Sequence, residues 1–217
     1  STPGHVVKLI KSGAFDKKEP ELVSAWNAWA EIYPTYKYET LPRWIDDTMT
    51  QKCVQWLQSH PTGLLWVEFP DLGDRVSATT GIPFYHSKSV NAAGVHIDKH
   101  LAGKPAIVSV KACAYGLNLQ HKFDCAAYPT PMSTNTLWEQ SLGRFHRDGQ
   151  PTPTVTAETW MVCDEAYQSM LYARSRAQHT QDTLQQSQKL CYADICDFSA
   201  VEAWRKDAED GGLWATV

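Results

Sequence analysis

The stretch GLLWVEF, Gly63 to Phe69, is a short apolar run with Pro61 before it and Pro70 directly after it. A run of this length between turn-forming residues is typical of a buried strand. Helical patterns separate several similar runs further along the chain. Strands that alternate with helices predict a parallel sheet covered on both faces, so the expected fold class is α/β. The other predicted strands are 82–86, 105–110, 123–128 and 154–163.

Two helices are predicted before the first strand. Residues 21–33 place four apolar side chains on one face, and residues 41–60 form a second pattern with Pro42 near its start. An aromatic stripe of this kind packs in a core far more often than it holds a ligand. The apolar positions are Leu22, Trp26, Trp29 and Tyr33 in the first helix and Ile45, Met49, Val54 and Leu57 in the second.

A polar, glutamine-rich helix is expected after the last strand, from Asp164 to about Cys191. Its acidic first turn suits the positive end of the helix dipole. The predicted organisation is therefore a helical extension over 1–60, a sheet domain over 61–163, and a C-terminal bracing helix with a tail over 164–217.

Composition limits the possible functions. The chain has 217 residues, a hydrophobic fraction of 43% and nine tryptophans, which together favour a packed globular protein. The net charge of −4 is unusual for a dedicated nucleic-acid-binding domain. The six cysteines form no CxxC pair, so we expect reduced thiols in a cytoplasmic protein and no metal site. No signal peptide or membrane span is expected. The chain begins with Ser1, and we expect a piece of a longer polypeptide.

The stretch WEQSLGRFHRDGQ, residues 138–150, combines two sets of residues at helical spacing. The polar set lies about 200° around the axis from the apolar set, so the two should face opposite ways. We expect a helix over 136–147, started by a capping box of Thr136 and Glu139. The apolar set is Trp138, Leu142 and Phe145, and the polar set is Gln140, Arg144 and Arg147.

Gly143 stands beside Arg144 in this helix, although a mid-helix glycine costs about 1 kcal/mol relative to alanine. A glycine at this position would allow a partner molecule to approach the helix closely. Arginine is suited to forked recognition of phosphate oxygens, so the pair Arg144 and Arg147 could hold a triphosphate end. We expect this pair at the carboxyl edge of the sheet, and a role in an ATP-driven motor is expected to depend on that position. Taken alone, two solvated surface arginines are an equally good interpretation.

The segment SVKACAYGLNLQ, residues 109–120, follows the predicted strand 105–110. Ligands in parallel sheets bind beyond the carboxyl ends of strands, and Gly116 marks a turn there. Its polar side chains could meet a phosphate backbone or a nucleotide. By itself, however, the segment favours an ordinary strand-to-helix loop.

Taken in order, LLWVEF, SVKACAYGLNLQ and WEQSLGRFHRDGQ resemble motifs IV, V and VI of superfamily 2 helicases, most closely the Snf2-like branch and its phage relatives. The sixth motif of that family is approximately Q-x-x-G-R-x-H-R-x-G-Q, and this chain matches it at every signature position. The resemblance covers roughly residues 60–190. It implies the second RecA-like lobe of an ATP-driven motor on nucleic acid. The matching residues are Gln140, Gly143, Arg144, His146, Arg147, Gly149 and Gln150 in motif VI, and Ser109, Lys111, Ala112, Gly116, Asn118 and Leu119 in motif V.

The resemblance also implies a role for each matched residue. Arg147 would be the arginine finger that reaches the γ-phosphate, Arg144 would contact phosphate or bridge to the partner lobe, and Gln140 would help to set that face. Gly116, Asn118 and Gly143 would lie by the nucleotide. Ser109 and Lys111 would lie near the nucleic-acid backbone. His86 and Lys88 would join them, although a surface histidine is nearly as good an interpretation of His86.

Two features depart from the family. Cys113 and Ala114 stand where the fifth motif has two glycines, and no phosphate loop is found, since AGKP (102–105) lacks its first glycine and its Ser/Thr. Asp164 and Glu165 follow the arginine motif, so they start a helix and are not a magnesium-binding pair. The resemblance therefore implies that ATP and Mg²⁺ are held mainly by a missing N-terminal RecA-like lobe, and that this chain alone is inactive.

The expected partners are that lobe and DNA, with RNA as a second possibility, and no membrane. The expected location is the cytoplasm, or the host cytoplasm if the source is viral. The alternative is a non-enzymatic nucleic-acid-binding or regulatory module derived from a helicase lobe. A structural protein with a fortuitous motif is a remote third interpretation.

Overall fold

The computed structural model describes residues 8, 10–12, 20–32, 34–35 and 41–192. The chain divides into two compact units, Ser1–Trp44 and Ile45–Val217. In the first unit, helix α2 spans Pro20–Ile32 and buries none of its residues. The stripe that includes Leu22 and Trp29 was expected to pack in a core, but both side chains are exposed. Tyr33 lies outside the described residues.

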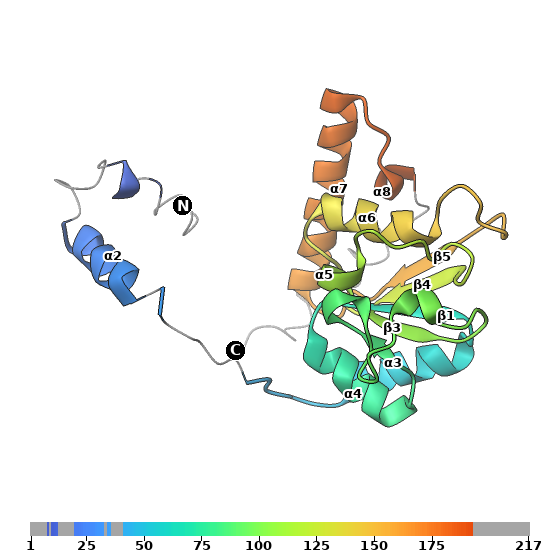
Figure 1. Ribbon diagram of the computed structural model, residues 1–217. Coiled ribbons are helices and arrows are strands. Elements are labelled where there is room, and N and C mark those ends of the chain that lie inside the picture. Colours follow the sequence, from blue (N-terminus) through green and yellow to red (C-terminus); the bar gives the residue numbers. More distant parts are fainter. Residues whose placement is uncertain (1–7, 9, 13–19, 33, 36–40, 193–217) are drawn as a thin grey trace, which may run out of the picture. The chain divides into compact units, whose positions relative to one another are not determined.

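The second unit is built on a five-stranded sheet in the order β2-β3-β1-β4-β5, in which every neighbouring pair is parallel. Figure 1 shows this sheet with helices on both sides. The parallel sheet with helices on both faces confirms the predicted α/β fold class. All five strands occur where the sequence predicted them, each somewhat shorter: β1 Gly63–Val67, β2 Phe84–Tyr85, β3 Ala106–Ser109, β4 Cys125–Tyr128 and β5 Thr156–Thr159.

The apolar run that predicted β1 is buried throughout. Successive side chains of a strand point to opposite faces. Leu64 and Trp66 therefore enter one hydrophobic cluster, while Leu65 and Val67 enter the other. A central strand with a core on each side needs an unbroken apolar run, which is why GLLWV does not alternate with polar residues.

Helices α3 and α4 cover one face, and α5 to α8 cover the other (Figure 1). Helix α4 was not predicted, although Pro70 in its first turn and Gly81, left-handed at its C-cap with φ 73°, are ordinary helix boundaries. Two 3₁₀ turns, η1 and η2, lie between β2 and β3. The helix bounds are α3 Thr48–Ser59, α4 Pro70–Thr80, α5 Val110–Cys113, α6 Asn135–Phe145, α7 Asp164–Leu184 and α8 Lys189–Tyr192; the turns are η1 Ser87–Ser89 and η2 Ile97–Lys99.

The predicted boundary at residue 60 is wrong, because α3 belongs to the sheet unit. Its Cys53 and Leu57 are buried in the core cluster that contains Val67. The helix also begins at Thr48, not near Pro42. The Asp46 side chain accepts a hydrogen bond from the backbone N–H of Thr48 and so marks the start of the helix. Ile45 precedes this start and is 97% exposed, contrary to the expected apolar face.

The C-terminal region forms two helices where one was predicted. Asp164 and Glu165 occupy the first turn of α7, as expected. The helix ends before Gln185, which has a left-handed φ of 53°. Met170 and Ala173 bury the inner face of α7 against the sheet.

Membrane spans, metal ligands and cysteines can each be followed in the described residues. No helix there has both the length and the apolar character that a bilayer span requires. The same residues contain no group of three or more His, Cys, Asp or Glu side chains placed to share a metal ion. Five cysteines are free thiols: Cys53, Cys113, Cys125, Cys163 and Cys191; Cys196 lies outside the described residues.

Candidate functional site

Helix α6 has the two faces that its spacing predicted. Trp138, Leu142 and Phe145 are buried in the core cluster under the helix. Ser141 is buried with them and accepts a hydrogen bond of 3.0 Å from the Tyr128 hydroxyl on β4. These contacts fix the helix on the sheet, so the side chains on its other face have a rigid support.

Arg144 lies on that outer face, half-buried in the last turn of α6. Its Nε donates to the backbone oxygen of Gln140 at 3.0 Å, and its Nη1 donates to that of Leu117 at 3.2 Å. Burial lowers the pKa of Arg144, and the neighbouring positive charge of Arg147 lowers it further. The two guanidinium groups are therefore close enough to repel each other.

Arg147 is not on the helix, contrary to the prediction. Helix α6 ends at Phe145, and Arg147 follows in an exposed bend. Its Nη1 donates to Oδ1 of Asn118 at 2.7 Å. The backbone N–H of Leu119 donates in turn to the carbonyl of Arg144 at 2.9 Å. Three hydrogen bonds thus hold the loop 114–120 against the end of α6.

The loop makes these contacts after a turn at Gly116, which has a φ of 70°. Few residues other than glycine adopt this left-handed conformation without strain. Gly116 and Asn118, the residues expected to lie by the nucleotide, are exposed. Cys113 and Ala114, which replace two glycines of the family pattern, are both fully buried. Cys113 is the last residue of the short helix α5 and Ala114 is its C-cap, so the turn is left to Gly116.

The arginine pair lines an open depression of about 510 Å³. Neither guanidinium forms an ion pair with a carboxylate in the described part of the chain; their hydrogen-bond acceptors are the neutral oxygens named above. A depression with two positive charges of this kind suits an anion. Its lining residues are Glu139, Gln140, Gly143, Arg144, His146, Arg147, Asp148 and Lys189.

Two features of the lining, the space beside Gly143 and an oxygen of Gln140 that is unpaired in the described part of the chain, suit the binding of a ligand or a partner. A Cβ added at Gly143 would meet no atom within 4 Å in the described part of the chain, so no packing seen there requires glycine. The Oε1 atom of Gln140 is buried without a hydrogen-bond partner among the described residues. A hydrogen-bond donor from a ligand or a partner would satisfy this oxygen, whereas an anion would be bound by the arginines and not by Gln140 Oε1.

The arginine pair was expected at the carboxyl edge of the sheet, and this expectation is wrong. Helix α6 leaves the carboxyl end of β4 and returns past it. Its 11 residues span about 16 Å, whereas the four residues of β4 span about 13 Å. Gln150, just after the arginines, donates to the carbonyl of Phe123, which leads into the amino end of β4. Arg144 and Arg147 therefore lie toward the amino side.

The predicted nucleic-acid contacts do lie at the carboxyl edge. His86 follows β2, and Lys88 lies in η1 with a φ of 56°. Lys111 is in the short helix after β3, and the Ser89 hydroxyl donates to the Ala112 carbonyl at 3.2 Å, which ties the two loops together. His86, Lys88 and Lys111 are exposed.

Ser109 differs from these three, because it is only 4% exposed at the end of β3. The structure therefore removes it from the candidate surface. The fold places the remaining three at one edge and the arginine pair toward the other, so the two candidate sites are separate.

The sequence patterns predicted a capping role for Glu139, which is wrong, and did not indicate that Lys189 belongs to the site. The predicted capping box does not form: α6 begins at Asn135, with Thr134 at its N-cap. Glu139 instead accepts hydrogen bonds from Lys189, 50 residues away. Nothing in the local pattern around Lys189 indicates this contact, because it depends on the path of the whole C-terminal region.

No family model and no curated protein matches the sequence. Among solved structures, one described as the C-terminal part of the Fun30 ATPase domain is similar, with a TM-score of 0.48 and 19% identity. The match covers 70% of this chain and 53% of that one. The chain thus spans about half the length of the solved chain that it resembles.

Proposed function

We propose that this chain is the C-terminal lobe of an ATP-dependent nucleic-acid helicase or translocase. The observation that carries the proposal is the direct bonding of the two motif segments, and not the position of the arginines, which do not lie at the carboxyl edge where they were expected. Arg144 and Arg147 are held by Leu117 and Asn118, and neither guanidinium has a carboxylate partner among the residues that the structure describes. Two solvated surface arginines would not need this support.

In this proposal, the depression faces the nucleotide held by a second, phosphate-loop lobe. Arg147 would be the arginine finger, since its guanidinium is exposed and its acceptor on Asn118 is neutral. Arg144, which is more deeply set, would hold the phosphate chain or the partner lobe. Gly143 and Gln140 would form the floor. ATP with Mg²⁺, when bound, supplies the free energy of hydrolysis that drives closure and opening of the two lobes.

The carboxyl edge would track the nucleic acid. His86, Lys88 and Lys111 come from adjoining loops and would contact phosphates, which gives affinity without sequence preference. Because these residues and the arginine pair are carried by one sheet, closure on the nucleotide would move the nucleic-acid contacts as a rigid set. The track would be DNA, with RNA as the second candidate, in the cytoplasm of the cell or of a viral host.

The test is ATP turnover by a protein that contains both this chain and the phosphate-loop lobe, with and without DNA. Arg147→Ala should lower DNA-stimulated turnover by roughly 10³-fold, the range for an arginine finger, and leave thermal unfolding unchanged. This chain alone should not hydrolyse ATP. Turnover that survives Arg147→Ala would contradict the proposal. Salt-dependent DNA binding in a protein without nucleotide-dependent activity would favour a non-enzymatic module.

A further inference from the structure

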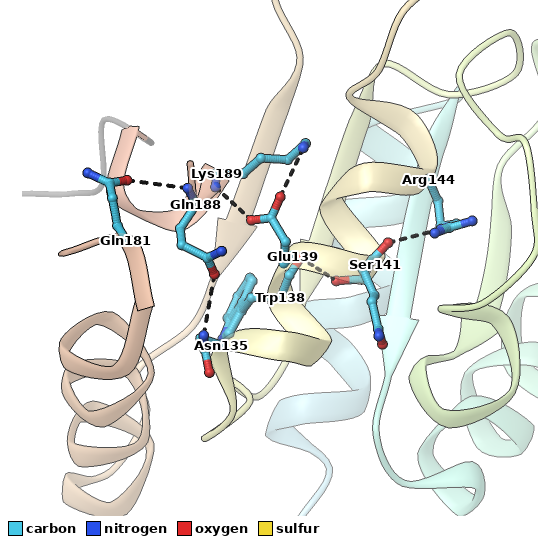
Figure 2. A network of polar contacts seen from close by, with 9 residues as sticks. Asn135, Trp138, Glu139, Ser141, Arg144, Gln181, Gln188 and Lys189 are labelled. Atoms are coloured by element: carbon cyan, nitrogen blue, oxygen red, sulfur yellow. Dashed lines mark hydrogen bonds and ion pairs between the residues drawn. The ribbon is translucent and has the colours of Figure 1, made fainter. Parts of the chain in front are cut away.

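Helix α8 supplies part of the wall of the arginine depression. The backbone N–H of Lys189 donates to Oε2 of Glu139 at 2.6 Å, and its Nζ donates to Oε1 at 3.0 Å. Figure 2 shows the two side chains pointing toward each other from α8 and α6. Both residues line the depression together with Arg144 and Arg147.

The position of Lys189 is fixed by its neighbours. Gln188 accepts a hydrogen bond from the Asn135 amide at the start of α6, and its backbone N–H donates to the Gln181 side chain on α7 (Figure 2). Leu190, the next residue, is 2% exposed in the main core cluster. Polar contacts on one side of Lys189 and a buried leucine on the other hold it against Glu139.

Lys189 decides the charge of the depression. The lining contains three cations, Arg144, Arg147 and Lys189, against two carboxylates, Glu139 and Asp148, a net charge of +1. Without Lys189 the net charge would be zero. Glu139 would then be an uncompensated carboxylate, one helical turn before Gly143, where an approaching phosphate would meet it. Like charges at that distance repel, and partial burial weakens the screening.

We propose that Lys189 is a positioning residue of the arginine site: by pairing with Glu139 it leaves Arg144 and Arg147 free to bind a polyphosphate. The proposal rests on the proposed function and assigns a role to the C-terminal hairpin of α7 and α8. That hairpin is then part of the anion site as well as a brace on the sheet.

The test is a titration of the whole chain with inorganic tripolyphosphate, followed by NMR through the side-chain Nε–Hε signals of Arg144 and Arg147. Lys189→Met keeps the apolar stem and the backbone donor but removes the charge. It should weaken binding roughly twofold to fivefold, the range for a partly exposed ion pair. Lys189→Arg should bind as the wild type does.

Glu139→Gln separates charge from structure. Combined with Lys189→Met, it should restore wild-type affinity, because neither partner then carries a charge. A merely structural ion pair would give no such rescue. Lys52→Met is the matched control: it lowers the net charge equally, but it lies on α3, on the opposite face of the sheet. It should bind as the wild type does.

Each outcome is decisive. If Lys189→Met binds tripolyphosphate as tightly as the wild type, or if the double variant stays as weak as the single one, the role of Lys189 is wrong while the arginine site stands. If the wild type itself does not bind, the anion site and this proposal both fail. Should Lys189→Met not fold, Glu139→Gln alone still tests the idea, since weaker binding by that variant would overturn it.

Discussion

Arg147 donates a hydrogen bond of 2.7 Å to the side-chain oxygen of Asn118, a residue 29 positions earlier in the chain. The acceptor is a neutral amide, so the bond orients the guanidinium without cancelling its charge. A carboxylate at the same place would orient it equally well and neutralise it. The choice of asparagine therefore fits an arginine that must act on a separate anion.

Asn118→Asp tests this relationship, since the two side chains have nearly the same shape. The new carboxylate should pair with Arg147 and lower nucleotide turnover of the two-lobed protein at least about tenfold, equivalent to about 1.4 kcal/mol. Thermal unfolding should stay the same or shift slightly upward, because exposed ion pairs contribute about 0–1 kcal/mol. Unchanged turnover in Asn118→Asp would show that Arg147 does not act through its charge.

Gly143→Ala should separate stability from function. The added Cβ meets no atom of the described residues within 4 Å, so the variant should fold normally and gain up to about 1 kcal/mol of helix stability. Turnover should nevertheless fall, because the methyl group projects into the space that a ligand or partner lobe needs. Chemical denaturation and ATPase assays measure the two effects.

Gly73→Ala is the contrasting variant. Its Cβ would lie 2.6 Å from the Phe84 ring, so it should lose stability directly. If Gly143→Ala kept full ATPase activity, Gly143 would not be a point at which a ligand or partner lobe approaches the helix closely.

Lys88 and Lys111 should contribute to DNA binding through phosphate contacts. Replacing either by alanine should weaken binding about equally for all sequences and reduce the slope of log K against log salt by about 1. Fluorescence anisotropy at several salt concentrations gives this slope. Lys52→Ala, on α3, should leave it unchanged. Equal slopes for the wild type and both edge variants would move the nucleic-acid site away from this edge.

Cys53 should make the fold sensitive to alkaline pH. Burial in the core raises the pKa of its thiol to about 12, from an ordinary value of 9.0. The folded state holds the thiol proton more tightly than the unfolded state does. The contribution of Cys53 to the free energy of unfolding is therefore complete below pH 9 and is lost progressively as the pH rises toward 12. The free energy of unfolding should fall there by up to about 1.4 kcal/mol per pH unit from this group. Urea unfolding between pH 8 and about 11 measures the effect, and Cys53→Ala should make the decline less steep.

Local sequence patterns predicted the five strands of the sheet domain and its helices α3 and α6, but not α4. The runs at 63–69 and 105–110 contain β1 and β3, two inner strands of the sheet, because a strand buried on both faces is almost entirely apolar. The spacing of Trp138, Leu142 and Phe145 predicted the buried face of α6, because helical periodicity is a local property. Helical spacing likewise predicted that Arg144 lies on the outer face of α6.

Tertiary structure decided the remainder. The sequence could not show that α6 ends before Arg147, that it carries the arginines toward the amino side of β4, or that Ser109 is buried. Glu139 seemed to be a capping residue and instead binds Lys189, 50 residues later. Periodicity records which side of an element is apolar, since that depends on neighbours three or four residues away. The edge of the sheet that an element reaches, and the distant side chain that it meets, depend on element lengths and on the path of the chain, which no local pattern contains.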